Sequence, residues 1–282
     1  MRMLARWGLA ILLTMSVTEA ASKVLVHGHR GARAMRPENT LPAFEYAIQV
    51  GVDVLEMDVS VTKDDVLVVS HNPTLLPSIC TGPQPNAVIR ELTLDELRKY
   101  DCGTLKNRNF PSQQPVPGTR IPTLDEVLTL AAPSKVEFNI ETKIFAARPE
   151  YTPAPEEFAR LMLAEIRKHH LESRVILQSF DFRTLHAMKR LAPEIRLSAL
   201  YEGAAKDFVA IAREAGAEIV SPHYTLVNKQ QVAVAHKAGL QVVPWTANTP
   251  KDWDMLLEAK VDAIITDDPA ALIAYLKSLG RR

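Results

Sequence analysis

The sequence has little of what marks several specialised classes of protein. Its 33 lysines and arginines balance 33 aspartates and glutamates, so there is no excess of charge of either sign. A balanced charge gives no reason to expect nucleic acid or an anionic membrane surface as a partner. The chain also has no internal repeat beyond alternating strand and helix patterns, and no low-complexity tract. These absences leave the composition of an ordinary folded domain.

Long hydrophobic runs are absent except near the start of the chain. Two arginines form a short basic region there, and the apolar stretch Trp7–Val17 follows. This pattern is typical of a secretory signal peptide over residues 1–21, and its apolar part is too short for a comfortable membrane span. We expect cleavage after Ala20 or Ala21, which leaves an exported protein, periplasmic or secreted, without stable insertion in a membrane. A buried N-terminal helix and an uncleaved anchor are the alternatives.

Cysteine is also scarce. The two cysteines, Cys80 and Cys102, lie in one loop-rich segment. Because disulfides form in oxidising compartments, a cysteine pair in an exported protein is more often bridged than free. We therefore expect a Cys80–Cys102 disulfide, which would stabilise the segment by about 3 kcal/mol in the chain-entropy model. The alternative is two unpaired small residues.

From residue 22 onward, apolar β-branched runs alternate with amphipathic helical stretches. Eight strands are predicted, at Val24–His29, Val52–Val59, Val136–Lys143, Val175–Phe180, Arg196–Tyr201, Glu218–His223, Gln241–Thr246 and Ala263–Thr266. Helices are predicted at Thr40–Val50, Leu124–Ala131, Pro155–His170, Phe182–Leu191, Ala205–Ala215, Asn228–Ala238, Lys251–Ala259 and Ala270–Leu279. Such alternation is typical of a parallel sheet with a covered outer face. Residues 22–282 are close to the roughly 250 residues of a (β/α)8 barrel, so we predict a single TIM barrel. An open doubly wound sheet is the alternative.

One segment interrupts this alternation. Residues 73–122 are rich in proline and contain one predicted short helix, Leu94–Tyr100. Loops this long inside a compact domain are usually functional. In a barrel, a loop after the second strand belongs at the C-terminal ends of the strands, where active sites lie. We therefore predict a small insertion that walls one side of the barrel mouth and is held by the cysteine pair.

Ionisable side chains gather at the C-terminal ends of the predicted strands. Residues two apart in a strand share a face, so Glu56 and Asp58 point the same way, as do Glu141 and Lys143. In a barrel the shared face is the interior, where three unpaired carboxylates would repel one another. A hard divalent cation, Ca2+ or Mg2+, prefers oxygen ligands and resolves this repulsion. We predict one cation at Glu56, Asp58 and Glu141; pairing with Arg30, Lys143 or backbone donors is the alternative.

Two histidines are predicted to flank these carboxylates. His29 ends the first strand, and a turn centred on Asp64 sends the chain back from the second. Antiparallel pairing across that turn places His71 opposite Met57, one residue from Asp58. Imidazoles on both sides of a metal fit a general acid and a general base. The four histidines on predicted helices are expected to be packed or surface residues: His169, His170, His186 and His236.

Two basic side chains are predicted at the same mouth. Arg30 and Lys143 supply fixed positive charge, which suits a phosphate group whose transition state spreads negative charge over several oxygens. Asn39 stands at a helix start and is a candidate N-cap. The neighbouring Glu38 is a candidate partner for Arg30 or for a histidine.

Five blocks of the sequence carry a resemblance to a known family. They read HRGARAMRPENTLPAF, LEMDVSVTKDDVLVVSHNPTL, FNIETK, LQSF and TDDP, and they span nearly the whole chain after the first 21 residues. The chain resembles the glycerophosphodiester phosphodiesterase family. The resemblance implies a (β/α)8 barrel that hydrolyses a small glycerophosphodiester to sn-glycerol 3-phosphate and an alcohol, with one divalent cation. It also implies that the segment after His71 is the insertion characteristic of the family.

The same resemblance implies a role for each site residue. The roles are metal ligation for Glu56, Asp58 and Glu141; acid–base catalysis for His29 and His71; phosphate binding for Arg30 and Lys143; and substrate binding for Gln178 and Trp245. Packing at the top of the barrel is an equal alternative for Trp245. In the implied mechanism, one histidine deprotonates the neighbouring glycerol hydroxyl or a water, and the other protonates the departing alcohol. Their order stays open.

Three rival interpretations differ in class. The His27-x-His29 pair suggests a metal-dependent amidohydrolase, but that family needs further histidines on middle strands, and only His223 could serve. A phospholipase-D-like relative would act on lysophospholipids with the same site. A non-catalytic exported binding protein on the same barrel would have no need for two titrating histidines.

Overall fold

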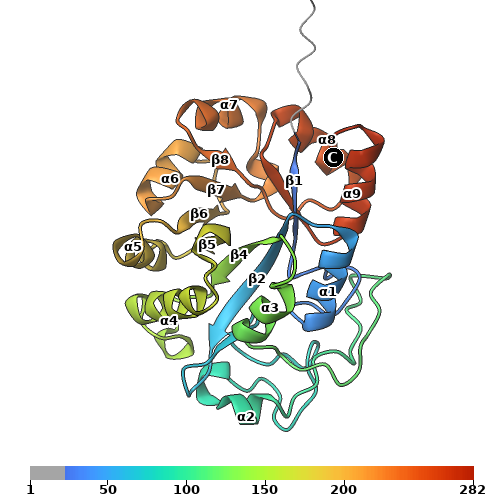
Figure 1. The fold of residues 1–282 in the computed structure, drawn as a ribbon, viewed down its shortest axis with the longest axis vertical. Helices are drawn as coiled ribbons and strands as arrows, with labels where there is room; N and C mark the ends of the chain where they lie inside the picture. The colour runs from blue at the N-terminus through green and yellow to red at the C-terminus, as the bar shows by residue number, and fades with distance from the viewer. Residues whose placement is uncertain (1–22) are drawn as a thin grey trace, which may run out of the picture.

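Eight parallel strands form a barrel in residues 23–282, the part of the chain that the structure describes, and helices cover its outside (Figure 1). The structure is a computed structural model. The parallel strands are β1 (Leu25–Gly28), β2 (Val54–Val61), β4 (Glu137–Thr142), β5 (Val175–Ser179), β6 (Arg196–Tyr201), β7 (Ile219–Pro222), β8 (Gln241–Val242) and β9 (Ala263–Thr266). Their order is β8–β7–β6–β5–β4–β2–β1–β9. The predicted signal peptide, residues 1–21, lies outside the described residues.

Backbone hydrogen bonds join the first and last strands of this order, β8 and β9, and so close the barrel. The amide of Asp262 donates to the carbonyl of Val242 at 3.1 Å, and the amide of Ile265 donates to the carbonyl of Pro244 at 3.0 Å. The amide of Ala247 in turn donates to the carbonyl of Ile265 at 3.1 Å. The predicted (β/α)8 barrel is therefore confirmed, and the alternative of an open sheet is wrong.

The burial of β2 explains how one strand serves both the core and the site. All of its residues are buried, as expected of a strand that is covered on both faces. Leu55, Met57 and Val59 belong to the main hydrophobic core, which the surrounding helices complete. The residues between them, Glu56 and Asp58, therefore face the interior of the barrel.

The helices around the barrel are α1 (Leu41–Val50), α3 (Leu124–Ala131), α4 (Pro155–Lys168), α5 (Phe182–Leu191), α6 (Phe208–Ala215), α7 (Lys229–Lys237), α8 (Pro250–Ala259) and α9 (Pro269–Ser278). A capping box of Thr123 and Glu126 begins α3. Gly51 and Gly216 end α1 and α6 in the left-handed conformation. Within residues 23–282, no helix combines the length and the apolar character needed to cross a membrane.

Helix α6 and strand β8 are among the elements that are shorter than predicted. Helix α6 begins only at Phe208, because the side chain of Asp207 accepts hydrogen bonds from the first amides of the helix. Strand β8 ends at Val242 and does not reach Thr246, since Pro244 lacks the amide hydrogen that a strand ladder needs. The chain after β8 keeps its contact with β9 through the bonds described above.

A hairpin returns the chain from β2. Strand β3 (Leu67–Val69) is antiparallel to β2, with Val59 opposite Val69. Extended by two residues, this register places His71 opposite Met57, as the sequence predicted. The hairpin therefore carries His71 back toward the strand that holds the carboxylates.

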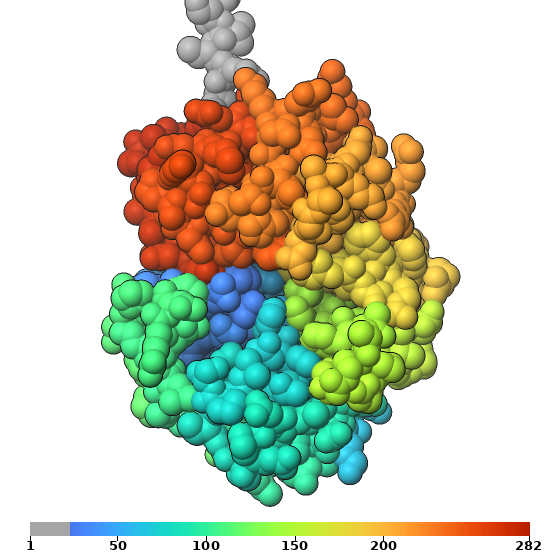
Figure 2. Space-filling view, turned by 180° about the vertical axis from the view of Figure 1, so that it is seen from behind, coloured from blue at the N-terminus to red at the C-terminus, as the bar shows by residue number. Residues whose placement is uncertain are grey.

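The insertion between β3 and α3 has its own small core. It contains the short helix α2 (Leu94–Leu97), and Cys80 and Cys102 form the predicted disulfide. Buried side chains beside the disulfide include Ile89 and Tyr100. The insertion borders the hollow on the face of the molecule that Figure 2 shows.

The insertion supports the loop after β1 and does not line the cavity described below. The side-chain amide of Gln113 donates to the carbonyl of Arg33 at 2.7 Å. The ring of Phe110 lies 5.1 Å from the Arg33 guanidinium carbon. None of the residues that line the main cavity belongs to residues 73–122. The insertion therefore lies beside the mouth without lining the cavity itself, and it acts on the cavity through this loop.

Candidate active site

The C-terminal ends of the strands surround a cavity of about 420 Å³. All nine side chains predicted for the site line this one cavity: His29, Arg30, Glu56, Asp58, His71, Glu141, Lys143, Gln178 and Trp245. They come from β2, β4 and β5 and from the segments that directly follow β1, β3, β4 and β8. Closure of the barrel therefore assembles a site from parts that lie far apart in the sequence.

A tight turn after β1 brings Arg30 to the carboxylates. Arg30 and Gly31 both have left-handed backbone conformations, with φ of 49° and 82°. A side chain at Gly31 would lie 2.8 Å from the backbone of Ala43 in α1, so this turn requires glycine. In this conformation the Arg30 amide donates to Oε2 of Glu56 at 2.8 Å.

Three carboxylates converge at the bottom of the cavity. Asp58 on β2 pairs directly with Glu141 on β4, and Glu56 lies two residues before Asp58. One oxygen from each of the three lies within 4.8 Å of the others. Their side chains are 1 to 9% exposed. A hard divalent cation takes oxygen ligands of this kind, so the described residues fit one such ion.

Neighbouring charges make the pKa values of these three buried carboxylates unequal. Burial and the charge of Asp58 raise the pKa of Glu56 well above its ordinary value. Burial also raises the pKa of Glu141 to about 7, although Lys143 opposes this. Burial works in the same direction on Asp58, but the charges of Arg30, His71 and Lys143 and the hydrogen bond from Asn39 together outweigh it and hold the pKa of Asp58 below its ordinary value. A bound cation would favour the ionised form of all three.

Arg30 and Lys143 pair with these carboxylates only in part. Arg30 Nη1 donates to Oε1 of Glu38 at 2.7 Å, and Arg30 Nε lies 3.3 Å from Oδ2 of Asp58. Lys143 Nζ lies 2.8 Å from Oε1 of Glu141 and 3.7 Å from Oδ1 of Asp58. Arg30 Nε is buried and has no hydrogen-bond acceptor among the described residues. The site therefore keeps an N–H group that a bound oxygen could satisfy.

Two side-chain amides orient the carboxylates. Asn39 Nδ2 donates to Oδ2 of Asp58 at 2.9 Å. The prediction that Asn39 caps α1 is wrong, because Thr40 holds the N-cap position and the Asn39 backbone is left-handed. Gln178 Nε2 donates to Oε1 of Glu56 at 2.8 Å. Gln178, predicted to bind substrate, thus also fixes one candidate metal ligand.

His29 has a partner to which the sequence analysis assigned no role. Its Nδ1 lies 2.5 Å from Oδ1 of Asp267, which follows β9. Arg33 Nε and Asn248 Nδ2 donate to the same carboxylate at 2.6 and 2.8 Å. Burial lowers the pKa of His29, and Asp267 partly offsets this effect. A proton on Nδ1 leaves Nε2 available, 3.9 Å from Oε2 of Glu56. The signal that could have revealed Asp267 is its place in the TDDP block, at the end of a barrel strand.

His71 completes the pair of histidines at the cavity. Its Nδ1 lies 3.2 Å from Oδ1 of Asn72, and burial lowers its pKa to about 4 although Asp58 opposes this. His27 does not line the cavity, and burial lowers its pKa to about 3. In residues 23–282, neither His27 nor His223 belongs to a group of candidate metal ligands. The structure therefore does not favour the amidohydrolase interpretation.

Comparison with known proteins identifies the family. The sequence model of the glycerophosphoryl diester phosphodiesterase family matches residues 29–271. The chain belongs to this family. A glycerophosphodiester phosphodiesterase of Caldanaerobacter subterraneus is 33% identical over 258 residues, which cover 92% of this chain and 100% of that protein.

Solved structures agree with the fold of this family member. A structure from Silicibacter pomeroyi, assigned to the same kind of phosphodiesterase, has a TM-score of 0.86 and 32% identity. The match covers 92% of this chain and 95% of that one. A phosphodiesterase of Oleispira antarctica, solved in complex with the product sn-glycerol-3-phosphate, shares the fold with a TM-score of 0.77 at 23% identity. That match covers 90% of this chain and 97% of the other.

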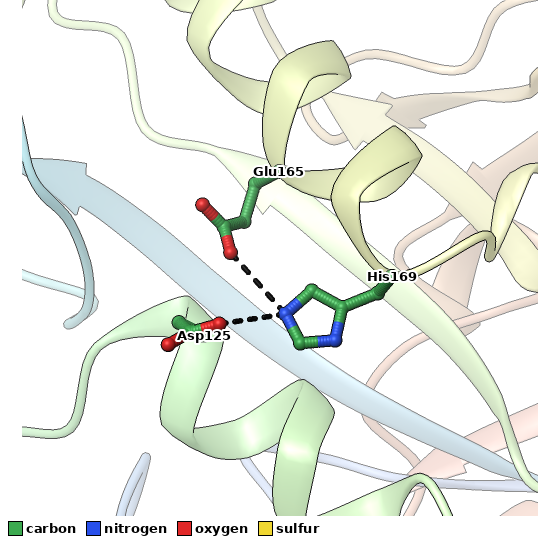
Figure 3. A group of neighbouring side chains, drawn as sticks. All are labelled: Asp125, Glu165 and His169. Carbon is green, nitrogen blue, oxygen red and sulfur yellow. Dashed lines mark hydrogen bonds and ion pairs between the residues drawn. The ribbon is translucent and has the colours of Figure 1, made fainter.

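A second group of candidate metal ligands lies outside the barrel. Asp125 on α3 faces Glu165 on α4 and His169 just after it (Figure 3). His169 Nε2 lies 2.7 Å from Oδ1 of Asp125 and 3.3 Å from Oε1 of Glu165. Lys168 Nζ contacts the same two carboxylates at 2.6 and 3.0 Å. Because a lysine already balances these charges, we assign this group to the packing of α3 against α4.

Proposed function

We propose that this chain hydrolyses glycerophosphodiesters to sn-glycerol 3-phosphate and an alcohol, with a divalent cation and two histidines. The observation that carries the proposal is that His29 and His71 line one cavity with three converging carboxylates. Family membership and the named activity of the Caldanaerobacter relative support the same substrate class.

Glu56, Asp58 and Glu141 are the proposed ligands of Ca2+ or Mg2+. The ion would neutralise negative charge on the phosphodiester oxygens. Arg30 and Lys143 would add fixed positive charge beside the same phosphate. The buried Arg30 Nε, which lacks an acceptor in the described residues, is suited to a phosphate oxygen.

The two histidines are proposed to move the protons. His29 suits the proton acceptor, because Asp267 at Nδ1 leaves Nε2 available and stabilises the imidazolium that forms. The proton would come from the neighbouring glycerol hydroxyl or from water; attack by the hydroxyl gives a cyclic phosphate, which water then opens. His71 suits the donor to the departing alcohol. The negative phosphodiester beside it would raise its pKa from about 4 toward the range that a donor needs.

The test is release of glycerol 3-phosphate from glycerophosphocholine, measured after removal of metal and after addition of Ca2+ or Mg2+. We expect release with a cation and its loss after chelation. No release under any of these conditions would contradict the proposed reaction. Full activity in excess chelator would contradict only the role of the metal.

A second candidate is phospholipase-D-like cleavage of lysophospholipids by the same site. A lysophospholipase D of Rattus norvegicus is 25% identical over 281 residues, 89% of this chain and 86% of that protein. Apolar side chains also line part of the cavity, among them Ile144 and Leu200. Release of choline from lysophosphatidylcholine faster than glycerol 3-phosphate from glycerophosphocholine would favour this candidate.

We also propose that the enzyme acts outside the cytoplasm, as the signal-peptide pattern of the first 21 residues suggests. N-terminal sequencing of protein recovered from the exported fraction should begin at Ala21 or Ser22. An exported protein that still begins at Met1, or a protein found only in the cytoplasm, would contradict the predicted cleavage.

A further inference from the structure

The cavity at the barrel mouth has a second half that the proposed chemistry does not use. Carbon-rich side chains line it beside the charged ones: Ile144, Phe145, Phe180, Leu200 and Trp245. Phe180 is 41% exposed, although an apolar residue of this size is normally buried. These side chains are therefore candidates to contact one arm of a bound phosphodiester.

The aromatic part of this wall is held in place. The rings of Phe180 and Trp245 meet edge to face, with centroids 5.4 Å apart and planes at 85°. The ring of His223 lies 5.2 Å from that of Trp245, at 86°. Trp245 Nε1 already donates to the carbonyl of Ser221 at 2.9 Å. The wall therefore offers a ligand ring surfaces and not a free N–H group.

One carboxylate at this wall has no balancing charge. Glu202, just after β6, lines both the mouth cavity and a groove that adjoins it. Within residues 23–282, Glu202 makes no side-chain hydrogen bond or ion pair. The neighbouring charges are balanced, because Arg183 holds Asp181 and Lys206 holds Glu214, each at 2.6 Å. The wall thus carries a net negative charge at Glu202.

We propose that this half of the cavity binds the alcohol part of the substrate, that it prefers an alcohol carrying an ammonium group, and that Glu202 sets this preference. The inference rests on the proposed phosphodiester hydrolysis. Aromatic faces attract cations, and proteins use such faces to recognise quaternary ammonium groups. The glycerol arm needs several hydrogen-bond partners, which ring faces do not supply. The charged half of the cavity suits the phosphate and glycerol, and this half suits the cationic head group.

The first test compares two substrates that differ in the charge of the head group. We would measure kcat/KM for glycerophosphocholine and for the uncharged glycerophosphoglycerol in the wild type, Glu202→Gln and Glu258→Gln. Glu258 lies on α8, is exposed and does not line the cavity, so its variant controls for loss of one charge. We expect Glu202→Gln to lower kcat/KM for glycerophosphocholine by about 3- to 10-fold, as for a partly exposed cation contact. Turnover of the uncharged substrate should stay the same, and Glu258→Gln should change neither.

The second test measures binding without turnover. Quenching of tryptophan fluorescence would report the binding of choline and of its uncharged isostere dimethylbutanol to the wild type and to Glu202→Gln. We expect the wild type to bind choline about 3- to 10-fold more tightly than the isostere, and we expect this preference to shrink in Glu202→Gln, where only the ring faces remain to attract the cation. This result in a protein that cleaves neither substrate would contradict the proposed function and still support the head-group site.

Three results would overturn the inference while the proposed function stands. Equal losses on both substrates in Glu202→Gln would place Glu202 at the glycerol arm. No loss on either would make it a solvated surface carboxylate. A wild type that binds dimethylbutanol as well as choline, and prefers lysophosphatidylcholine, would make the wall a site for an acyl chain.

Discussion

Two groups of side chains in this protein have the composition of a metal site, and their surroundings differ. Glu56, Asp58 and Glu141 lie at the barrel mouth, and Asp125, Glu165 and His169 lie between α3 and α4 (Figure 3). The mouth side chains are 1 to 9% exposed, whereas those of the second group are 15 to 46% exposed. Lys168 contacts both carboxylates of the exposed group.

The two groups differ in burial more than in composition, and burial gives the mouth carboxylates the greater need of a positive charge. At the mouth, burial raises the pKa of Glu56 and of Glu141, so their ionised forms cost free energy without a cation. In the second group, hydrogen bonds from Lys168 and His169 lower the pKa of Asp125. A cation would therefore relieve a cost at the mouth and only displace a lysine at the surface. Four predictions follow this contrast from the largest expected effect to the smallest.

Removing either imidazole at the mouth should have the largest effect. We expect His29→Ala or His71→Ala to lower kcat by about 100- to 10,000-fold, since each removes one proton-transfer group. Folding and cation binding should stay close to the wild type, which thermal unfolding and calorimetry would show. His170→Ala, on the outside of the barrel, is the control and should keep full activity. Near-normal turnover in either mouth variant would overturn the acid–base roles.

Neutralising one buried carboxylate should separate activity from stability. Because the pKa of folded Glu141 is about 7, above its ordinary 4.5, the group costs folding free energy once the pH rises through this range. Glu141→Gln should therefore stabilise the metal-free protein at pH 8 by roughly 1–3 kcal/mol, with a smaller gain at pH 5, while activity falls. Denaturant unfolding at both pH values measures this. Glu165→Gln in the exposed group is the matched control and should change neither stability nor activity. A Glu141→Gln variant that is less stable than the wild type at pH 8 would contradict the predicted cost of the buried carboxylate.

Asp267→Asn should have an intermediate effect, because Asp267 contacts His29 and does not line the cavity. We expect kcat/KM to fall by roughly 10- to 100-fold, less than for loss of the imidazole itself. Asp267 raises the pKa of His29, so its removal should shift the acidic limb of the pH profile to lower pH. An unchanged limb would mean that the contact is only structural.

Asp125→Asn should have the smallest effect. It removes ion pairs to Lys168 and His169 that are partly exposed to solvent. Pairs of this kind contribute about 0–1 kcal/mol, so the free energy of unfolding should fall by less than about 1 kcal/mol. Activity and cation affinity should not change. Loss of turnover in Asp125→Asn would show that the exposed group contributes to the active site, and the two groups would then no longer differ in function.

The sequence predicted the barrel and the parts of the site that follow from local patterns. Alternation along β2 turned Glu56 and Asp58 inward, and the turn at Asp64 set the register that carries His71. The residues that were missed depend on contacts between distant segments. The contact of His29 with Asp267 joins residues 238 positions apart and exists only because β1 pairs with β9.

Local rules also failed where a tertiary contact outweighed them. Asn39 stands where an N-cap is expected, but Asp58 takes its side-chain amide, and Thr40 begins the helix. The insertion was expected to wall one side of the barrel mouth, but which of its residues reach the cavity could not be predicted, because its order comes from a separate small core around the disulfide. Irregular segments of this kind have no periodicity from which packing could be predicted.

The most direct test of the central claim is to measure cation binding and turnover in the same samples. Metal-free wild type and Glu141→Gln would be titrated with Ca2+ or Mg2+ by calorimetry, while glycerol 3-phosphate release from glycerophosphocholine is followed. The account predicts one site in the wild type and activity that rises with its occupancy. It also predicts affinity at least about tenfold weaker in the variant, since even partners of metal ligands contribute about 10- to 100-fold. A wild type that is fully active without bound cation, or a variant that binds as tightly, would contradict the claim.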